Sequence, residues 1–380
     1  MSQPIDISTR NWFMNNTSRC PLAMQGRPQF EVKTMSSDHF LSFEKVIVTA
    51  KFIAPSGEDI EKRIEVRINP VSGRTSRIAF GRGAEKEPGT ESLPLPPPNA
   101  DDTAGCPFCK PQVMSKTPRI LADIFPGGRF CYNNSILFPN LFPYGRYSAV
   151  SLFDNQHFVE IGASSVSSYT DCFINCRNYL CHILESDPKA VYMAITQNHL
   201  PSAGGSLLHP HLQINAERIA PNHHRFFRKR AEEYFHQTGS YLFSDYLLHE
   251  KQDGSRYVGK NASWEWITAF APEGFFEIWG ILPKITSLRQ ITDEDWNHLA
   301  HGVINIQKFY RSLCRNGYNL GMLFVEDGNS YLEIRVVILA RSNYAPWVRN
   351  DHTGFEIMLG DMATFTSPED TAKNARIFWT

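Results

Sequence analysis

The sequence predicts an α+β fold with a largely antiparallel sheet and helices on one side of it. The first observation behind this prediction is a pattern of strand, helix, strand and strand that occurs twice, over residues 147–213 and 275–339. The second is that each helix of the pattern carries one apolar stripe, formed by side chains three or four residues apart. Because such a helix buries its stripe against a single layer, both helices are expected to cover the same sheet.

The first copy begins with an extended segment at 147–153 and continues into an amphipathic helix at about 165–185. A strand is expected at 190–196, and a loop then leads to the strand that contains His209 and His211. The apolar stripe of the helix consists of Val166, Tyr169, Phe173, Cys176, Leu180 and Ile183.

The second copy begins with a strand at 275–283. Thr292 is a good N-cap for the helix that follows, and Asp295 stands at the capping-box position. Strands at 318–325 and 331–339 are expected to complete this copy. The apolar stripe of its helix consists of Trp296, Leu299, Val303, Ile306 and Leu313.

Several sulfur and imidazole side chains allow a structural interpretation as well as a functional one. Cys172 and Cys176 share a helix face, but together with Cys181 they are interpreted as buried structural thiols rather than as a second metal site. His223 and His224 lie among four basic residues, and we expect them on a solvated helix face.

The first hundred residues carry weaker patterns. Residues 1–38 show no periodicity and are expected to form an extended arm, whereas residues 85–102 are rich in proline and are expected to form a loop or linker. Strands are predicted at 43–52, 63–68 and 74–82.

Composition narrows the class of protein. The 380 residues suffice for two domains or one large domain, and a formal net charge of −1 gives no field that would attract nucleic acid or an anionic membrane. No apolar run is long enough to span a bilayer, and the N-terminal residues lack the core of a signal peptide. Eight cysteines in this length do not indicate a disulfide scaffold, so we expect a reduced, cytoplasmic protein.

The stretch Gly204–Gln213 concentrates the chemistry of the chain. His209 and His211 flank Pro210 in an extended segment, so their side chains are expected on the same side, with Gln213 next in the row. The glycines before them allow backbone N–H groups to approach an anion. The stretch therefore predicts a phosphate site with a nucleophile or a metal ligand at its centre.

A second motif is the pair Cys106 and Cys109. In a reduced compartment, Cys-x-x-Cys forms either a metal knuckle or a redox pair. A redox pair would follow a strand and open a helix, but here a proline-rich stretch precedes the pair and Lys110-Pro111 follows it. This context favours the metal knuckle, which for zinc needs two further ligands.

Together, these motifs resemble the galactose-1-phosphate uridylyltransferase family, a branch of the histidine-triad superfamily, from about Arg67 to the C-terminus. The resemblance implies two histidine-triad-like units. The matching elements, in family order, are Asn69-Pro70-x-x-Gly73, Arg82, Cys106 with Cys109, Asn133-Asn134, His157, Asn198, Gly204–Gln213, Phe355-Glu356-x-x-Leu359 and Pro368-Glu369.

The resemblance implies a structural zinc and a covalent mechanism. Cys106, Cys109, His157 and His209 would hold the zinc as two thiolates and two imidazoles, a closed set for this metal. His211 would attack the α-phosphorus of a nucleotide-linked substrate and form a nucleotidyl-histidine, which a phosphate-bearing acceptor would then take up.

Binding roles and assembly follow from the same resemblance. It implies a homodimer in which the C-terminal segment with Gly354 and Glu356 reaches the partner's site, next to the substrate's sugar. The residues implied in holding or offsetting the phosphates are Arg82, Gly204, Gly205, Ser206 and Gln213. The residues implied in the nucleoside and α-phosphate pocket are Phe108, Asn133, Asn134 and Asn198.

The predicted domain division has three parts. Residues 1–62 form an arm and the first strand, residues 63–230 the catalytic half with the knuckle, and residues 231–380 a half without the catalytic histidines.

The chain also departs from the family pattern. A second phosphate-binding arginine is replaced by Glu85, and a lysine and a glutamine expected near Asn350 and Met362 are absent. The His-x-His that binds iron in many members reads Glu333-Ile334-Arg335, and the matching glutamate is replaced by Phe227. We therefore expect no iron, and the nucleotidyl transfer is better supported than the recognition of a hexose.

Three functions remain open from the sequence. The favoured one is a nucleotidylyltransferase that moves UMP or AMP to a hexose 1-phosphate. A variant uses inorganic phosphate as acceptor, as relatives do that phosphorolyse nucleotide sugars or adenylylsulfate. The alternative from another class is a catalytically silent, zinc-stabilised nucleotide-binding protein, against which the joint presence of His211 and Gln213 argues, since neither is needed for zinc.

Overall fold

The computed structural model describes residues 41–80, 93–343 and 352–379. Contacts divide the chain into two units, 1–39 and 40–380, and all described residues belong to the second. The expected arm before Asp38, as well as Arg82, Glu85 and Asn350, lie outside the described residues.

A ten-stranded sheet forms the centre of the described chain, and every neighbouring pair in it is antiparallel. This confirms the α+β class and the antiparallel sheet expected from the sequence. In spatial order the strands are β4 (Phe130–Tyr132), β5 (Ser135–Pro139), β6 (Tyr147–Leu152), β8 (His211–Glu217), β7 (Tyr192–His199), β12 (Gly317–Val325), β13 (Ile334–Arg341), β11 (Phe275–Leu282), β10 (Trp264–Thr268) and β9 (Tyr257–Asn261).

The duplication is a property of the whole sheet. Strands β4 to β6, helix α2 (Val166–Ser186) and strands β7 and β8 form one half. Strands β9 to β11, helix α5 (Asp293–Ser312) and strands β12 and β13 repeat the same order in the other half. The halves join where β7 pairs with β12, from Tyr192 opposite Val325 to His199 opposite Tyr318. The site therefore draws on both halves through one continuous sheet.

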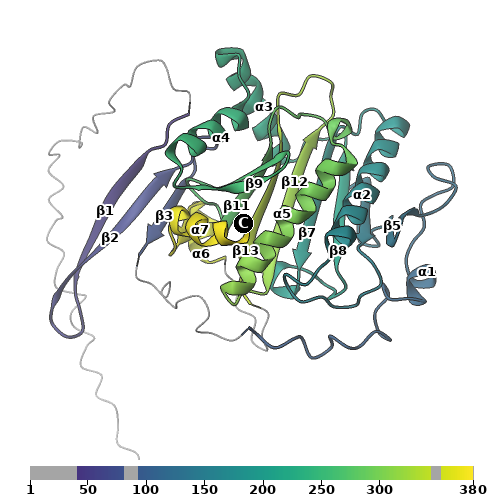
Figure 1. Ribbon diagram of the computed structural model, residues 1–380, viewed down its shortest axis with the longest axis horizontal. Helices are drawn as coiled ribbons and strands as arrows, with labels where there is room; N and C mark the ends of the chain where they lie inside the picture. Colours follow the sequence, from purple (N-terminus) through teal and green to yellow (C-terminus); the bar gives the residue numbers. More distant parts are fainter. Residues whose placement is uncertain (1–40, 81–92, 344–351, 380) are drawn as a thin grey trace, which may run out of the picture. The chain divides into compact units, whose positions relative to one another are not determined.

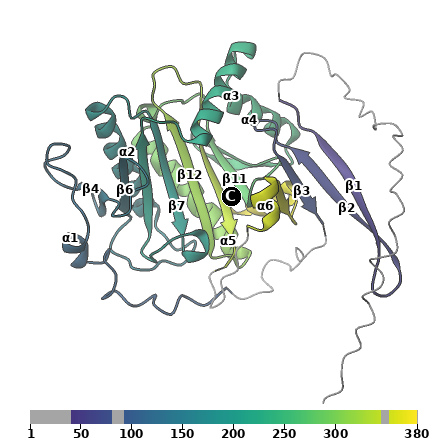
Figure 2. The same ribbon diagram turned by 180° about the vertical axis from the view of Figure 1, so that it is seen from behind.

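The long helices α2 and α5 lie together on one face of the sheet, in front of it in Figure 1 and behind it in Figure 2. Helix α5 begins at its predicted cap, and α2 begins at the predicted residue, which proves to be a cap as well. Ser165 accepts a hydrogen bond from the backbone N–H of Ser168, and Thr292 and Asp295 form the expected capping box. These caps satisfy N–H groups that the first turn leaves free, so they fix where each helix starts.

Two further helices, α3 (Asn222–Thr238) and α4 (Leu242–Asp253), lie on the opposite face of the sheet, where none was expected from the sequence. They share a second apolar cluster with Trp279 and Ile281 of β11, whereas Ile278 belongs to the cluster under α2 and α5. Alternate residues of a strand point to opposite faces, so α3 and α4 cover the second half from the side opposite α5. The prediction of helices on one side thus holds for the duplicated pair and not for α3 and α4.

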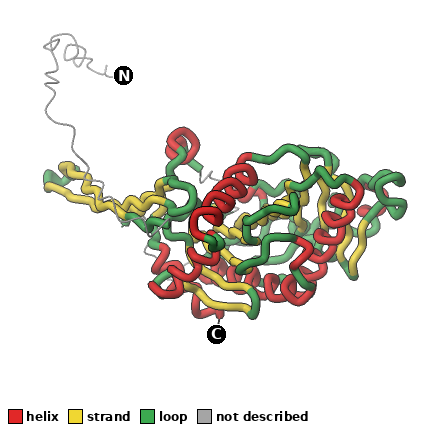
Figure 3. The backbone as a smooth tube through the Cα atoms, turned by 90° about the horizontal axis from the view of Figure 1, so that it is seen from above, coloured by secondary structure: helices red, strands yellow, loops and turns green. Residues whose placement is uncertain are grey.

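A smaller sheet contains the strands predicted at the start of the chain. Strand β1 has exposed or half-exposed side chains along its whole length, and it forms with β2 the long yellow hairpin that no red helix covers in Figure 3. In order, the sheet consists of β1 (Lys45–Ile53), β2 (Asp59–Ile68), β3 (Thr75–Ala79) and β14 (Met362–Thr364).

Charged side chains tie this small sheet to the second half. Glu369, at the start of helix α7 (Pro368–Ala375), accepts hydrogen bonds from Arg67 of β2 at 2.7 and 3.0 Å and from Arg256 at 2.8 Å. Both guanidinium groups also stack on the ring of Phe270, at 4.9 and 5.0 Å from its centre. Burial by itself would raise the pKa of Glu369, but these bonds outweigh it and lower the pKa to about 2.

The predicted elements compare well in the long segments and poorly in the short ones. Strand β13 begins at Ile334 rather than at Tyr331, and the five short strands β4, β5, β9, β10 and β14 were not predicted. The domain boundaries after residues 62 and 230 stay a prediction. Among the helices of the described residues, none is both long and apolar enough to cross a membrane.

Candidate active site

Four predicted ligands form a buried cluster beside strand β8. One ligand atom from each of Cys106, Cys109, His157 and His209 lies within 4.8 Å of all the others. The Cys109 sulfur is 3.4 Å from Nδ1 of His157 and 3.5 Å from Nδ1 of His209. Tetrahedral zinc, with bonds of about 2.3 Å to sulfur and 2.0 Å to nitrogen, places its ligands roughly 3.3–3.8 Å apart. The donor set and its spacing therefore fit this metal.

Backbone carbonyls beside the cluster determine which ring nitrogen of His157 and of His209 is free to bind a metal. Nε2 of His157 lies 3.2 Å from the carbonyl of Asn99, and Nε2 of His209 lies 3.0 Å from the carbonyl of Asp154. A carbonyl only accepts, so each Nε2 carries the proton and each Nδ1 keeps its lone pair. Burial and the neighbouring Cys106 raise the pKa of Cys109 to about 11, so a thiolate at this place requires a cation beside it.

His211, the first residue of β8, has the opposite arrangement of its ring nitrogens. Its Nδ1 lies 2.8 Å from the carbonyl oxygen of His209, to which it donates, so Nε2 keeps the lone pair. The side chain is 6 % exposed, and burial lowers its pKa, which favours the neutral imidazole. The two histidines of the motif therefore differ in the structure: His209 faces the cysteine–histidine cluster, and His211 turns the nitrogen with the lone pair away from the carbonyl of His209.

The loop before β8 approaches itself closely, and glycine is required there. A Cβ at Gly205 would lie 2.8 Å from the carbonyl oxygen of Asn198, and Gly204 adopts a φ of +90°. Leu200, with φ of +71°, holds the left-handed region without being a glycine. Ser206 is exposed at the end of this loop. The N–H groups of Gly204 and Gly205 donate within the loop, to the carbonyl oxygens of Pro201 and Leu200 at 3.0 Å each, so both groups are already paired there.

Side-chain amides continue the row from Gln213. The Nδ2 group of Asn198 donates to Oε1 of Gln213 at 3.3 Å, and Nδ2 of Asn319 donates to Oδ1 of Asn198 at 2.7 Å. Asn198 and Asn319 lie on adjacent strands, since they face each other in the register of β7 and β12. Asn319 belongs to the second half and was not predicted, because no local sequence pattern records which strands of a sheet become neighbours.

Phe108, within the knuckle, covers an apolar patch next to His211. Its ring centre lies 5.5 Å from that of His211 and 5.3 Å from that of Phe138, in an edge-on arrangement. Val150 and Leu152 of β6 complete this patch. Of the predicted nucleoside residues, Phe108 therefore lies against His211, and Asn198 lies next to Gln213 on the neighbouring strand.

The other predicted substrate residues lie elsewhere in the structure. Asn133, in the turn between β4 and β5, donates to Asp171 of α2, and Asn134 is exposed in the same turn. Gly354 and Glu356 lie in helix α6 (Gly354–Leu359), where the Glu356 carboxylate caps its own helix through Thr353. None of these four has a contact with His211 among the described residues, so their roles stay predictions.

The position matched to the iron site holds a different arrangement. The guanidinium carbon of Arg335 lies 4.8, 4.4 and 4.1 Å from the ring centres of Phe227, Phe243 and Trp279. Burial lowers its pKa to about 10, against the raising effect of Glu277 and Glu273, so the group stays charged at neutral pH. A fixed cation among aromatic rings offers no ligand to a metal ion.

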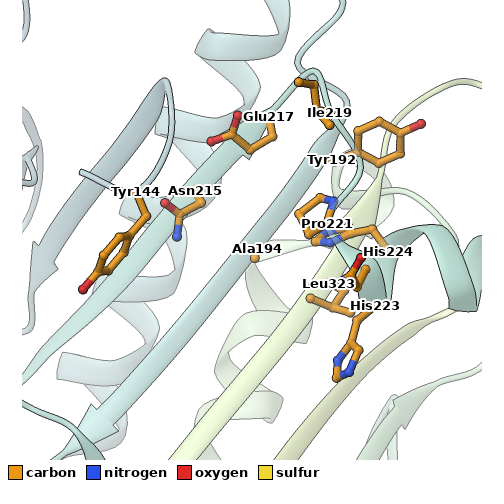
Figure 4. A pocket seen from close by; sticks show the side chains of 11 residues that line it. Tyr144, Tyr192, Ala194, Asn215, Glu217, Ile219, Pro221, His223, His224 and Leu323 are labelled. Atoms are coloured by element: carbon orange, nitrogen blue, oxygen red, sulfur yellow. The ribbon is translucent and has the colours of Figure 1, made fainter.

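A cavity of about 540 Å³ opens on the same face of β8, at Asn215 and Glu217 (Figure 4). It was not predicted, because its walls come from four separate elements, β7, β8, β12 and α3, and from the loops beside them. His224 shows why: the prediction of a solvated face is wrong for it, since it is buried and its Nε2 donates to the carbonyl of Met193 at 2.7 Å. The cavity is lined by Tyr144, Tyr192, Ala194, Asn215, Glu217, Ile219, Pro221, Asn222, His223, His224 and Leu323.

The fold is that of a duplicated protein of the galactose-1-phosphate uridylyltransferase type, as comparison with solved structures shows. The ADP-glucose phosphorylase of Arabidopsis thaliana, with ADP-glucose bound, has a TM-score of 0.63 at 18% identity and covers 82% of this chain and 98% of its own. A GalT-like protein of Arabidopsis thaliana gives 0.61 at 19% identity, with the same two shares covered. A uridylyltransferase gives 0.58 at 18% identity, over 83% of this chain and 98% of its own.

At the level of sequence, an uncharacterized protein of Archaeoglobus fulgidus is 27% identical over 342 residues, which span 89% of this chain and 99% of that protein. No family model matches the chain. The resemblance inferred from the motifs is thus confirmed for the fold.

Proposed function

We propose that the protein is a nucleotidylyltransferase that works through a covalent nucleotidyl-histidine at His211. In the first half-reaction, the lone pair of Nε2 forms a bond to the α-phosphorus of a nucleotide-linked donor. The bond from that phosphorus to the bridging oxygen breaks, and the leaving group departs with the electron pair. In the second, an oxygen of a phosphate-bearing acceptor forms the new bond to phosphorus, and the electron pair returns to the imidazole.

The observation that carries the proposal is the state of His211. Its Nδ1 proton is held by the carbonyl of its own chain, so the imidazole presents the free nitrogen that nucleophilic attack needs. The neighbouring side-chain amides of Gln213 and Asn198 would supply donors for the non-bridging phosphate oxygens. A histidine with a purely structural role would not need hydrogen-bond donors for phosphate beside it.

The remaining features suit the same function. Phe108 and its apolar patch offer a surface for a nucleobase, and the cavity at Asn215 offers room for the other part of a nucleotide-linked substrate. Zinc at the cysteine–histidine cluster would supply structural cross-linking of the knuckle to β8 and take no part in the transfer. The acceptor is either a hexose 1-phosphate or inorganic phosphate.

We also propose a homodimer in the cytoplasm. Three side chains of α6, Ile357, Met358 and Leu359, are 65–79 % exposed, although all are apolar. Exposed apolar groups of this kind mark contact surfaces, and the predicted partner contact lies in this segment. Light scattering at micromolar concentration should give twice the chain mass, and a monomer would contradict the proposal. The free cysteines among the described residues suit a reducing compartment.

Covalent labelling tests the proposal directly. The protein is incubated with UDP-glucose, ADP-glucose or adenylylsulfate carrying radioactive α-phosphorus, and acid-labile label on the chain is measured. We expect label from at least one donor, none on His211→Gly, and unchanged label on His301→Ala, which removes an exposed histidine of α5. Label that persists on His211→Gly would move the nucleophile elsewhere.

Absence of label from every donor, together with tight nucleotide binding, would instead favour the zinc-stabilised binding protein. Comparing UDP-glucose with ADP-glucose shows which base the protein accepts. Comparing ADP-glucose with adenylylsulfate shows whether the leaving group is a sugar phosphate or sulfate. Adding hexose 1-phosphate or inorganic phosphate to the labelled protein then identifies the acceptor by release of the label.

A further inference from the structure

A chain of hydrogen bonds runs across the sheet from the second half to the candidate site. Arg341, at the end of β13, donates from Nη1 to Oδ1 of Asn319 at 2.7 Å. Asn319 donates to Asn198 at 2.7 Å, and Asn198 donates to Gln213 at 3.3 Å. The relay therefore crosses four adjacent strands, β13, β12, β7 and β8.

The relay has a direction, which Arg341 sets together with the carbonyl oxygens of Gln197 and Ala203, because these two accept from Nδ2 of Asn319 at 3.4 and 2.9 Å. A side-chain amide is nearly symmetric in shape, so its oxygen and nitrogen can exchange places unless its partners distinguish them. A guanidinium group donates and never accepts, so Oδ1 of Asn319 must face Arg341. Its nitrogen then faces Asn198, whose nitrogen in turn faces Gln213. Each amide is thus oriented by the one before it.

The end of the relay is the group that matters for chemistry. Because Oε1 of Gln213 accepts from Asn198, the NH2 group of Gln213 is the part left to point away from the relay. An NH2 group donates to a phosphoryl oxygen, whereas an amide oxygen in its place would repel it. Turning one amide around would therefore convert a stabilising contact with the substrate into an unfavourable one.

Asn319 also ties the relay to the loop before β8. Its Nδ2 donates to the carbonyl oxygen of Ala203 at 2.9 Å, just before Gly204 and Gly205. At the other end, Nη2 of Arg341 lies 3.3 Å from Nδ1 of His352, close to helix α6. The relay is thus held at its start by Arg341 and in its middle by Asn319.

We propose that Arg341 is a positioning residue for the nucleotidyl transfer, which it assists by orienting the amide of Gln213 through Asn319 and Asn198. This inference rests on the proposed function for its rate effect, but the orientation itself is independent of any activity. It gives the second half, which lacks the catalytic histidines, a defined part in the site.

The orientation is tested by NMR, without substrate. In 15N-labelled protein, the side-chain amide signal of Gln213 is identified by its loss in Gln213→Ala. We expect this signal to shift or broaden in Arg341→Met and to stay in place in Arg341→Lys, because lysine is also purely a donor. The control Arg311→Met removes a surface partner of Glu160 and should leave the signal unchanged. An unmoved signal in Arg341→Met would overturn the inference.

The rate is tested in a double-mutant cycle. Arg341→Met should slow single-turnover labelling by about 10–100-fold, with the thermal midpoint and KM for the donor little changed, since such donors act mainly in the transition state. Arg341→Lys should restore the rate to within about threefold of the native chain.

The combined Arg341→Met and Gln213→Ala chain should be no slower than Gln213→Ala alone, because both changes remove the same contact. Effects that multiply would show that Arg341 does not act through Gln213. A native chain that accepts no label would contradict the proposed function, and the NMR result would still decide on the orientation.

Discussion

The two halves of the sheet use equivalent positions in different ways. His209 and His211 at the start of β8 correspond to Glu333 and Arg335 at the start of β13. His209 faces the metal cluster, whereas the buried carboxylate of Glu333 accepts hydrogen bonds from the N–H groups of Phe243, Ser244 and Lys284 at 2.7–2.9 Å. Both positions therefore hold a neighbouring segment onto the sheet, one with a metal ligand set and the other by capping the start of α4.

The second pair of equivalent positions, His211 and Arg335, differs in how far each side chain is covered by other elements. His211 presents a free nitrogen on a face that carries the cavity and the glycine loop, whereas Arg335 lies beneath Phe227, Phe243 and Trp279. Helices α3 and α4 cover the second half at this place. If His211 is the nucleophile, as we propose, the chemistry belongs to the half that α3 and α4 leave uncovered, and the covered half serves as support.

The largest expected effect concerns the zinc that we propose for the first half. We expect about one zinc per chain by metal analysis, and Cys106→Ser should lose the metal and lower the thermal midpoint together, because structural zinc contributes directly to folding. The control Cys131→Ser removes an exposed thiol of β4 and should change neither quantity. Purified native protein without zinc would contradict the assignment of the cluster.

Much of this first half could be predicted from the sequence. The knuckle, His157 and His209 were predicted as one ligand set, and the structure brings them together. The helices α2 and α5 carried strong signals, since a stripe with helical period and a capping residue are both local features.

The rest could not be predicted because it depends on contacts between distant segments. Strands β4 and β9 are too short to show alternation, and helices α3 and α4 give no sign of the face that they cover. Asn319 and Arg341 enter the site through the pairing of β7 with β12 and of β12 with β13, which is a matter of register. Family likeness drew attention to Asn133, but its partner Asp171 on α2 is visible only in three dimensions.

An intermediate effect is expected in the second half, at the position equivalent to the zinc ligand. Glu333→Gln replaces a carboxylate that accepts from several backbone N–H groups with an amide that can accept through one oxygen alone. The free energy of unfolding should fall by about 1–3 kcal/mol, the cost of leaving buried donors unpaired. Urea unfolding measures this loss, and zinc content should stay the same. If zinc were lost as well, the two halves would not be held independently.

The smallest effect concerns how the contacts that tie the small sheet to the second half respond to acid. Glu369 faces Arg67 and Arg256, with Glu65, Glu250 and Asp253 bound to the same two arginines. Its pKa of about 2 in the folded chain lies below the ordinary value of 4.5, so the folded state favours the charged form. The stability from this group is therefore fully present above about pH 4.5 and is lost as the pH falls from there through about 2. Glu369→Gln should unfold more easily at neutral pH, and its unfolding free energy should fall less steeply than that of the native chain as the pH is lowered over this range. Equal slopes for the two chains, measured by urea unfolding at several pH values, would show that the arginine pair does not hold Glu369 charged.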